Sequence, residues 1–138
     1  DIGSYSIKIA ELKSSAKSYS LRNFREYPLS PDPTQDKKIQ IIDILRNLVI
    51  EYNPDQTRFI LGVRQSHVSV RHKQFPFKER FKILRSIPFE LEDEVPLEQE
   101  EAVFDAKILS FQNQLTNVLA IACPKVFIQE VVDLAQDC

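Results

Sequence analysis

The chain opens with the segment Asp1-Ile-Gly-Ser-Tyr-Ser-Ile-Lys8, in which a Gly-Ser turn follows an acidic residue and leads into a β-branched stretch. The backbone amides of such a tight turn can point into a common space, and that geometry suits a phosphate group. Gly3 permits close approach of the backbone, and Ser4 adds a hydroxyl donor. The segment therefore predicts a phosphate-binding turn between two strands.

Two charged residues frame this turn. Lys8 offers a positive charge to a phosphate, and Asp1 could hold a hydrated Mg²⁺ through water, because Mg²⁺ prefers carboxylate oxygens and keeps its waters. No catalytic residue is predicted, and the candidate binding residues are Asp1, Gly3, Ser4, Tyr5 and Lys8. Gly-Ser turns beside an aspartate also occur in hairpins that bind no ligand, so the string alone leaves both interpretations open.

The residues after the turn predict the β-strands and the loop of a first unit. Extended runs at 6–12 and 19–27 are separated by a polar stretch, and we expect them to form a β-hairpin. Three prolines in 28–34 then exclude regular structure, because proline removes a backbone donor and restricts the residue before it.

A helix and a further strand complete this unit, which we expect to span residues 1–65. Apolar residues three and four apart predict a helix over 35–52, with Thr34 or Asp36 as its N-cap. The apolar run 58–63 is short and continuous, which is typical of a strand buried on both faces.

A second unit is predicted for residues 66–138, with the element order β-α-β-β-α. Pro88 is expected to kink or restart the first helix, whose apolar face we place on Phe81, Leu84, Ile87 and Leu91. The expected elements are a strand through 68–75, a helix over 78–94, strands at 102–110 and 117–122 with a turn at 112–114, and a helix over 125–136.

Composition sets limits on both units. With 138 residues, of which 43% are hydrophobic, the chain can build one compact domain or two small subdomains. It lacks an initiator Met and opens inside a strand-to-turn motif, so we expect a piece of a longer protein. The formal charge of -2 gives no global attraction to nucleic acid or anionic lipid. No apolar run approaches the roughly 20 residues needed to span a bilayer.

The reactive side chains do not form a recognisable catalytic or metal-binding set. Cys123 and Cys138 lie far from any zinc-ligand spacing and predict two free thiols. His67 and His72 are five apart on an expected strand, so they project to opposite faces and are not expected to share a metal. Neither belongs to a Ser/His/Asp arrangement, and hydrolase chemistry of that kind is not expected.

Charge is segregated in the second half of the sequence. Basic residues dominate 58–85, and acidic residues dominate 90–101. This predicts either a surface that steers a complementary partner or a solvated face with internal ion pairs. A nucleic-acid surface with Phe75 and Phe77 as stacking groups beside Arg71 and Lys73 is a weaker alternative, because the neighbouring carboxylates oppose it.

The opening turn resembles the phosphate hairpin of the actin/sugar-kinase/chaperone ATPase superfamily. Three later stretches make the resemblance more specific. The stretches are an acidic helix end with a proline at 86–97, an Asp-containing strand at 101–109, and a strand leading through Cys123 and Pro124 into an amphipathic helix. In order, they are similar to the PilM/GspL group of bacterial actin-like proteins, which is related to FtsA. Tyr5 departs from this pattern, because a smaller residue is more usual after Ser4.

This resemblance implies an α/β, actin-like (ribonuclease H-like) fold. Residues 1–65 would form the first part of subdomain 1A, and residues 66–138 a small α+β subdomain 1C. ATP and Mg²⁺ are implied as ligands of the full-length protein. A second phosphate loop and the adenine pocket would follow Cys138, so this chain would hold half of the site and is not expected to bind nucleotide alone.

The implied function is that of a cytoplasmic scaffold at the inner face of the bacterial inner membrane. It would belong to the assembly platform of a type IV pilus or type II secretion system and bind a PilN-like platform-protein tail or the secretion ATPase. Membrane association would be indirect, and self-association is compatible with the group. We expect a binding protein rather than an enzyme. The alternatives are a phosphotransferase or ATPase of the same superfamily and an FtsA-like cell-division filament protein.

Overall fold

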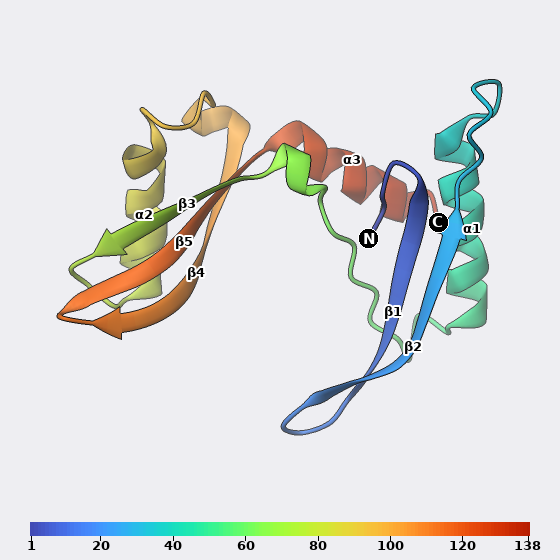
Figure 1. Cartoon of the computed structure of the whole chain (residues 1–138), viewed down its shortest axis with the longest axis horizontal. Helices are drawn as coiled ribbons and strands as arrows, with labels where there is room; N and C mark the ends of the chain where they lie inside the picture. The colour runs from blue at the N-terminus through green and yellow to red at the C-terminus, as the bar shows by residue number, and fades with distance from the viewer. The chain divides into compact units, whose positions relative to one another are not determined.

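The computed structural model describes residues 1–138 as two compact units (Figure 1). The first unit comprises Asp1–Arg64 and Val131–Cys138, and the second comprises Gln65–Glu130. The sequence analysis grouped 131–138 with the second unit, whereas Leu134 packs against the core of the first. The chain is α/β as predicted, with two antiparallel sheets and three α-helices. Assignment of the two segments to subdomains 1A and 1C stays a prediction.

The first unit is a β-hairpin packed on one helix. Strands β1 (Ser6–Ser14) and β2 (Tyr19–Pro28) pair antiparallel, and α1 spans Lys37–Glu51, so the expected hairpin and helix are confirmed. Asp36 is the N-cap, and its side chain accepts a hydrogen bond of 2.7 Å from the Lys38 amide. The buried core consists of Ile2, Ile7, Leu29 and Ile41, with Ile9, Tyr27, Ile44, Leu45, Leu61 and Leu134 packed against it.

The strand predicted at 58–63 is wrong, because this segment is not paired with any strand. Phe59 and Ile60 are exposed by 44% and 79%, and only Leu61 of the run packs on the core. The segment returns beside the start of the chain, where Arg64 Nε donates to the Ile2 carbonyl over 3.2 Å. That edge offers only two residues before the opening turn, which is too short for a ladder of hydrogen bonds.

The second unit is a three-stranded antiparallel sheet in the order β3-β5-β4 (Figure 1). The predicted element order is confirmed. A two-residue turn at Asn113 and Gln114 joins β4 to β5, and both residues have positive φ, as a type I′ hairpin requires. The bounds are β3 Ser69–Phe75, α2 Arg80–Leu91, β4 Ala102–Gln112, β5 Leu115–Pro124 and α3 Lys125–Gln136, with 3-10 turns at Gln65–His67 and Gln99–Glu101.

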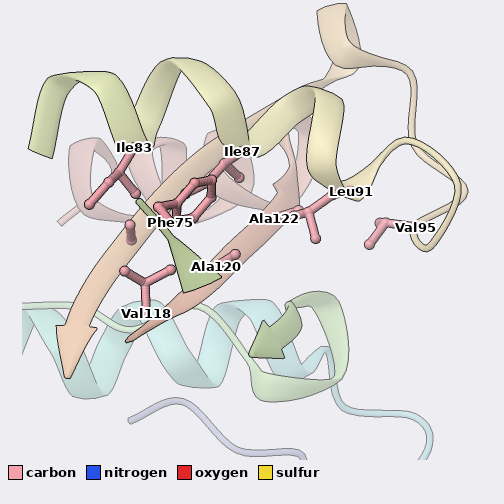
Figure 2. Close-up of a cluster of buried hydrophobic side chains, with 9 residues drawn as sticks. Phe75, Ile83, Ile87, Leu91, Val95, Val118, Ala120 and Ala122 are labelled. Atoms are coloured by element: carbon pink, nitrogen blue, oxygen red, sulfur yellow. The ribbon is translucent and has the colours of Figure 1, made fainter. Parts of the chain in front are cut away.

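Helix α2 covers one face of this sheet (Figure 2). It buries side chains four residues apart, namely Ile83, Ile87 and Leu91. They pack against β5, where small alanines allow close approach. Phe81 was predicted on this face but is 60% exposed, because the 83-87-91 register takes the buried stripe. The helix continues through Pro88 to Leu91, so the expected restart does not occur.

Candidate functional site

The opening segment folds into a tight antiparallel turn within the first unit. Ile2 pairs with Ile7, and the Gly3 amide donates to the Ser6 carbonyl over 3.0 Å. Asp1 and Lys8 form a doubly hydrogen-bonded backbone pair, with N···O distances of 2.8 and 2.9 Å. The five predicted binding residues are therefore brought together in one hairpin, with Ser4 and Tyr5 exposed at its tip.

Gly3 is required by the turn itself. A Cβ atom at this position would lie 2.9 Å from the backbone oxygen of Ser6, closer than real Cβ atoms come. The contact is with backbone rather than with a mobile side chain, so the turn would have to shift to admit any larger residue. A ligand is not needed to explain this glycine.

Two carbonyl groups at the tip are anchored on the same unit. The Ser4 carbonyl accepts from Lys37 Nζ at 3.3 Å, and the Tyr5 carbonyl accepts from the Leu29 amide at 2.8 Å. In a trans peptide the N–H points opposite to the C=O, so the amides of Tyr5 and Ser6 are directed away from these anchors. The Tyr5 side chain is 85% exposed, and it points to solvent rather than crowding the turn.

Charged side chains form a row across the three backbone segments of this hairpin. Asp1 lies opposite Lys8, and Lys8 lies opposite Glu26 on β2, so all three side chains share one face. Ser6 Oγ donates to Glu26 over 2.5 Å. The sequence analysis missed Glu26, because a bulge between Glu11 and Leu12 shifts the register, and counting from the turn would have placed Arg25 opposite Lys8. Lys8 thus lies between two acidic residues on this face, and one of them, Glu26, already accepts a hydrogen bond from Ser6.

A polar network ties the hairpin to the C-terminal end of α1. Arg25 donates to Glu51 over 2.9 Å and to the Tyr52 hydroxyl over 2.5 Å. The Tyr52 hydroxyl donates in turn to Glu11 over 3.0 Å. Desolvation and this last hydrogen bond raise the pKa of Tyr52, and the Glu51 bond raises the pKa of Arg25. The network holds the hairpin on the helix and is distant in sequence from the turn.

The histidines and cysteines lie elsewhere. The His67 ring stacks on Phe127 with ring centroids 3.6 Å apart, and His72 is exposed on β3. Cys123 and Cys138 are free thiols, and burial raises the pKa of both. No group of three histidine, cysteine or acidic side chains is arranged to hold a metal ion.

The second unit contains a shallow cavity of about 420 Å³, which the sequence analysis did not predict. Ala102 pairs with Pro124, and this register brings the start of β4 beside the end of β5. Lys125 Nζ donates to the Glu100 carbonyl over 2.6 Å and holds the rim in place. We call this cavity the α3 pocket; it is lined by Leu97, Glu100, Glu101, Pro124, Lys125 and Val126.

Internal ion pairs account for part of the segregated charge. Glu94 accepts from Lys73 at 2.6 Å and lies 3.5 Å from Arg71, and the Lys73 hydrogen bond lowers the pKa of Glu94. Both basic residues proposed for nucleic acid are thus engaged. Phe75 is buried, and Phe77 packs against the same core. The base-stacking alternative is therefore not supported.

None of the helices is both long and apolar enough to cross a membrane. The model of the family "type IV pilus assembly protein PilM" matches residues 1–138, the whole chain. A comparison with curated protein sequences found no match.

Two solved structures share the fold. One is described as a PilM-PilN type IV pilus biogenesis complex, with a TM-score of 0.69 and 18% identity over 99% of this chain and 42% of that one. The other is the cytoplasmic domain of EpsL, an inner membrane component of the type II secretion system of Vibrio cholerae. Its TM-score is 0.51 at 14% identity, over 98% of this chain and 49% of that one. The chain thus spans less than half the length of either.

Proposed function

Because this chain belongs to the family of type IV pilus assembly protein PilM, we propose that it is a binding component of the inner-membrane assembly platform, acting on the cytoplasmic side. Its task is to capture the cytoplasmic tail of a PilN-like platform protein. Its similarity in fold to a protein solved in a PilM-PilN complex supports this choice of partner.

The α3 pocket is the observation that carries the proposal. Its apolar lining residues are Leu97, Pro124 and Val126, and its charged lining residues are two glutamates, Glu100 and Glu101, and one lysine, Lys125. Its volume of about 420 Å³ is within the range of sites that hold an anchoring apolar group. The pocket therefore suits an extended tail with one buried apolar side chain and basic flanking residues.

Val126 provides the test, because a matched residue lies on the same helix. Val126 is 59% exposed in the pocket, and Val132 is 41% exposed outside it. We expect Val126→Asp to weaken binding of a fluorescently labelled platform-tail peptide by about tenfold or more in anisotropy titrations. Val132→Asp should leave the affinity within about twofold. Equal loss in both variants, or in neither, would exclude the pocket as the binding site.

A second candidate partner is the secretion ATPase that the resemblance to the PilM/GspL group implies. The same two variants separate these partners. Suppose that purified ATPase binds the wild-type chain, that Val126→Asp weakens this binding, and that the tail peptide does not bind. The α3 pocket is then the binding site of the ATPase instead.

We also propose that the opening turn contributes phosphate contacts to bound Mg-ATP in the full-length protein. The amides of Tyr5 and Ser6, which are directed away from their anchored carbonyls, and the Lys8 side chain support it, and we propose that Asp1 holds the hydrated metal. Calorimetric titration should show that Lys8→Ala weakens Mg-ATP binding by about tenfold. Lys13→Ala, a change at another exposed lysine on β1, is the control and should leave binding unchanged.

A further inference from the structure

The turn end of the β1–β2 hairpin carries exposed apolar side chains on both strands. Leu12 pairs with Leu21, and Tyr19 pairs with Ser14 closer to the turn. The exposed fractions are 55% for Leu12, 63% for Leu21 and 75% for Tyr19. Figure 1 shows that this end of the hairpin projects beyond α1. We call residues 12–24 the hairpin tip.

The apolar residues of the hairpin tip share the face that is turned away from the core of the first unit. Ile7 and Ile9 pack in that core, so alternation along β1 puts Leu12 on the opposite face. Leu21 lies across from Leu12, and Phe24 continues the same face further from the turn. A solvated strand face is ordinarily polar, and an exposed apolar patch is typical of an interaction surface.

The hairpin tip is basic, although the chain as a whole has a formal charge of -2. It contains Lys13, Lys17 and Arg22 and no acidic residue. Arg22 pairs with the neighbouring Glu11 at 3.2 Å. Lys13 and Lys17 are exposed and take part in no ion pair of the chain. Two positive charges therefore remain available at the tip.

We infer that the hairpin tip docks on the surface of an anionic phospholipid bilayer. Leu12 and Leu21 enter the boundary between the headgroups and the acyl chains. The ring of Tyr19 lies at the interface, where tyrosine is enriched in membrane proteins. Lys13 and Lys17 lie among the anionic headgroups, because the negative surface potential of the bilayer attracts them.

The size and the backbone of the tip fit a shallow contact of this kind. The chain from Leu12 to Ser15 extends about 10 Å at the rise of a strand. Segments that lie in the membrane interface are buried to a comparable depth of roughly 5–10 Å. The amide and the hydroxyl of Ser15 both donate to the Ser18 carbonyl, over 2.9 and 3.1 Å. Because the turn is closed in this way, fewer backbone groups must lose water when the tip enters the interface.

Charge complementarity favours a bilayer over other occupants of the tip. A second copy docked tip to tip would bring the same basic residues, and the two tips would repel each other. The platform tail proposed for the α3 pocket has basic flanking residues, so the tip would repel this tail too. An anionic leaflet attracts the lysines and offers an apolar layer beneath its charges. The contact goes beyond the proposed function, because it needs no platform protein.

A tryptophan introduced at the tip tests insertion directly, because the chain contains no tryptophan. Vesicles of equal parts phosphatidylglycerol and phosphatidylcholine, added at low salt, should shift the fluorescence emission of Tyr19→Trp to shorter wavelength. Tyr5→Trp is the matched control, since Tyr5 is 85% exposed at the other end of β1, and its emission should not shift. Brominated lipids should quench the fluorescence of the first variant only.

Vesicle flotation tests the charged and the apolar contacts separately. Lys17→Glu should lower the partition coefficient onto the same vesicles by at least about fivefold. Lys107→Glu, at an exposed lysine of β4, should leave it within about twofold. Leu21→Asp should lower it by about tenfold, whereas Ile39→Asp, at a 58% exposed residue of α1, should leave it within about twofold. High salt should weaken binding of the wild-type chain, because it screens the lysines.

Three results would overturn the proposal. They are a wild-type chain that does not float with anionic vesicles at low salt, equal binding to vesicles of phosphatidylcholine alone, and an equal emission shift at positions 5 and 19. If an added platform protein shields position 19 from an aqueous quencher while vesicles do not bind, the tip contacts that protein instead. Far-UV circular dichroism of each variant separates loss of docking from loss of fold.

Discussion

The two units differ in how completely they bury their apolar surface. In the second unit Ile83, Ile87 and Val118 are fully buried between α2 and a three-stranded sheet. In the first unit one face of the hairpin packs on α1, while the other leaves Leu21 and Phe24 more than half exposed. A two-stranded ribbon has marginal stability, whereas three strands under a helix make a closed core. The second unit is therefore the firmer frame, and it carries the α3 pocket.

The largest expected effect comes from opening the core of the second unit. Ile87→Ala should lower the free energy of unfolding by about 3–4 kcal/mol, because it removes a fully buried side chain and leaves a cavity. Ile41→Ala, at the less completely buried core of the first unit, should cost about 2 kcal/mol. Guanidinium unfolding of both variants measures the difference. If Ile41→Ala lowered the free energy of unfolding as much as Ile87→Ala or more, the second unit would not be the more firmly packed of the two.

Gly3→Ala tests the opening turn and should have the next largest effect. The added Cβ meets the Ser6 carbonyl at 2.9 Å, and moving this backbone should cost about 1–3 kcal/mol. Gly62→Ala is the control, because a Cβ there meets nothing within 4 Å. Thermal unfolding of the two variants gives the comparison, and equal stability in both would show that the turn tolerates a side chain.

Asp36→Ala probes the start of α1 with a smaller effect. Removal of the side chain that caps the Lys38 amide should cost about 1 kcal/mol. Asp36→Asn retains an acceptor and should lose only a fraction of that amount. Hydrogen exchange of the first α1 amides should quicken in the alanine variant. Unchanged exchange would mean that packing on the hairpin fixes this end of the helix without the cap.

The smallest effect is a pH dependence within the second unit. The pKa of Glu94 is lowered by its hydrogen bond from Lys73, so the carboxylate stabilises the folded chain above its ordinary pKa of 4.5. That contribution should disappear as the pH falls through the lowered value. Glu94→Gln should therefore lose less stability than the wild type between neutral and acidic pH. Parallel urea titrations at two pH values measure this, and identical losses would contradict it.

Local sequence patterns predicted most of the elements. The hairpin, α1 and α3 follow from alternation, apolar spacing and proline positions, which act within a few residues. The prediction of a strand at 58–63 was wrong because the composition of this run suits a buried strand, whereas no strand of the first unit pairs with it. Phe81 misled for a related reason. Its spacing fitted an apolar face, but the packing of α2 on β5 selected Ile83 instead.

The candidate sites divide in the same way. The residues of the opening turn are adjacent in sequence, so a short motif was enough to bring them together. Glu26 was missed because it joins Lys8 only through the hairpin register. The α3 pocket was missed because residues near 100 and 125 meet only where β4 begins beside the end of β5. Such contacts become visible only once strand pairing is known.

Photocrosslinking in the native cell tests most directly whether the second unit, rather than the opening turn, captures the platform partner. A photoreactive phenylalanine would replace Val126 in the α3 pocket or Tyr5 at the tip of the turn, both of which are exposed. The account predicts that position 126 crosslinks to a platform protein and position 5 does not. A crosslink to that protein from position 5, with none from position 126, would contradict it.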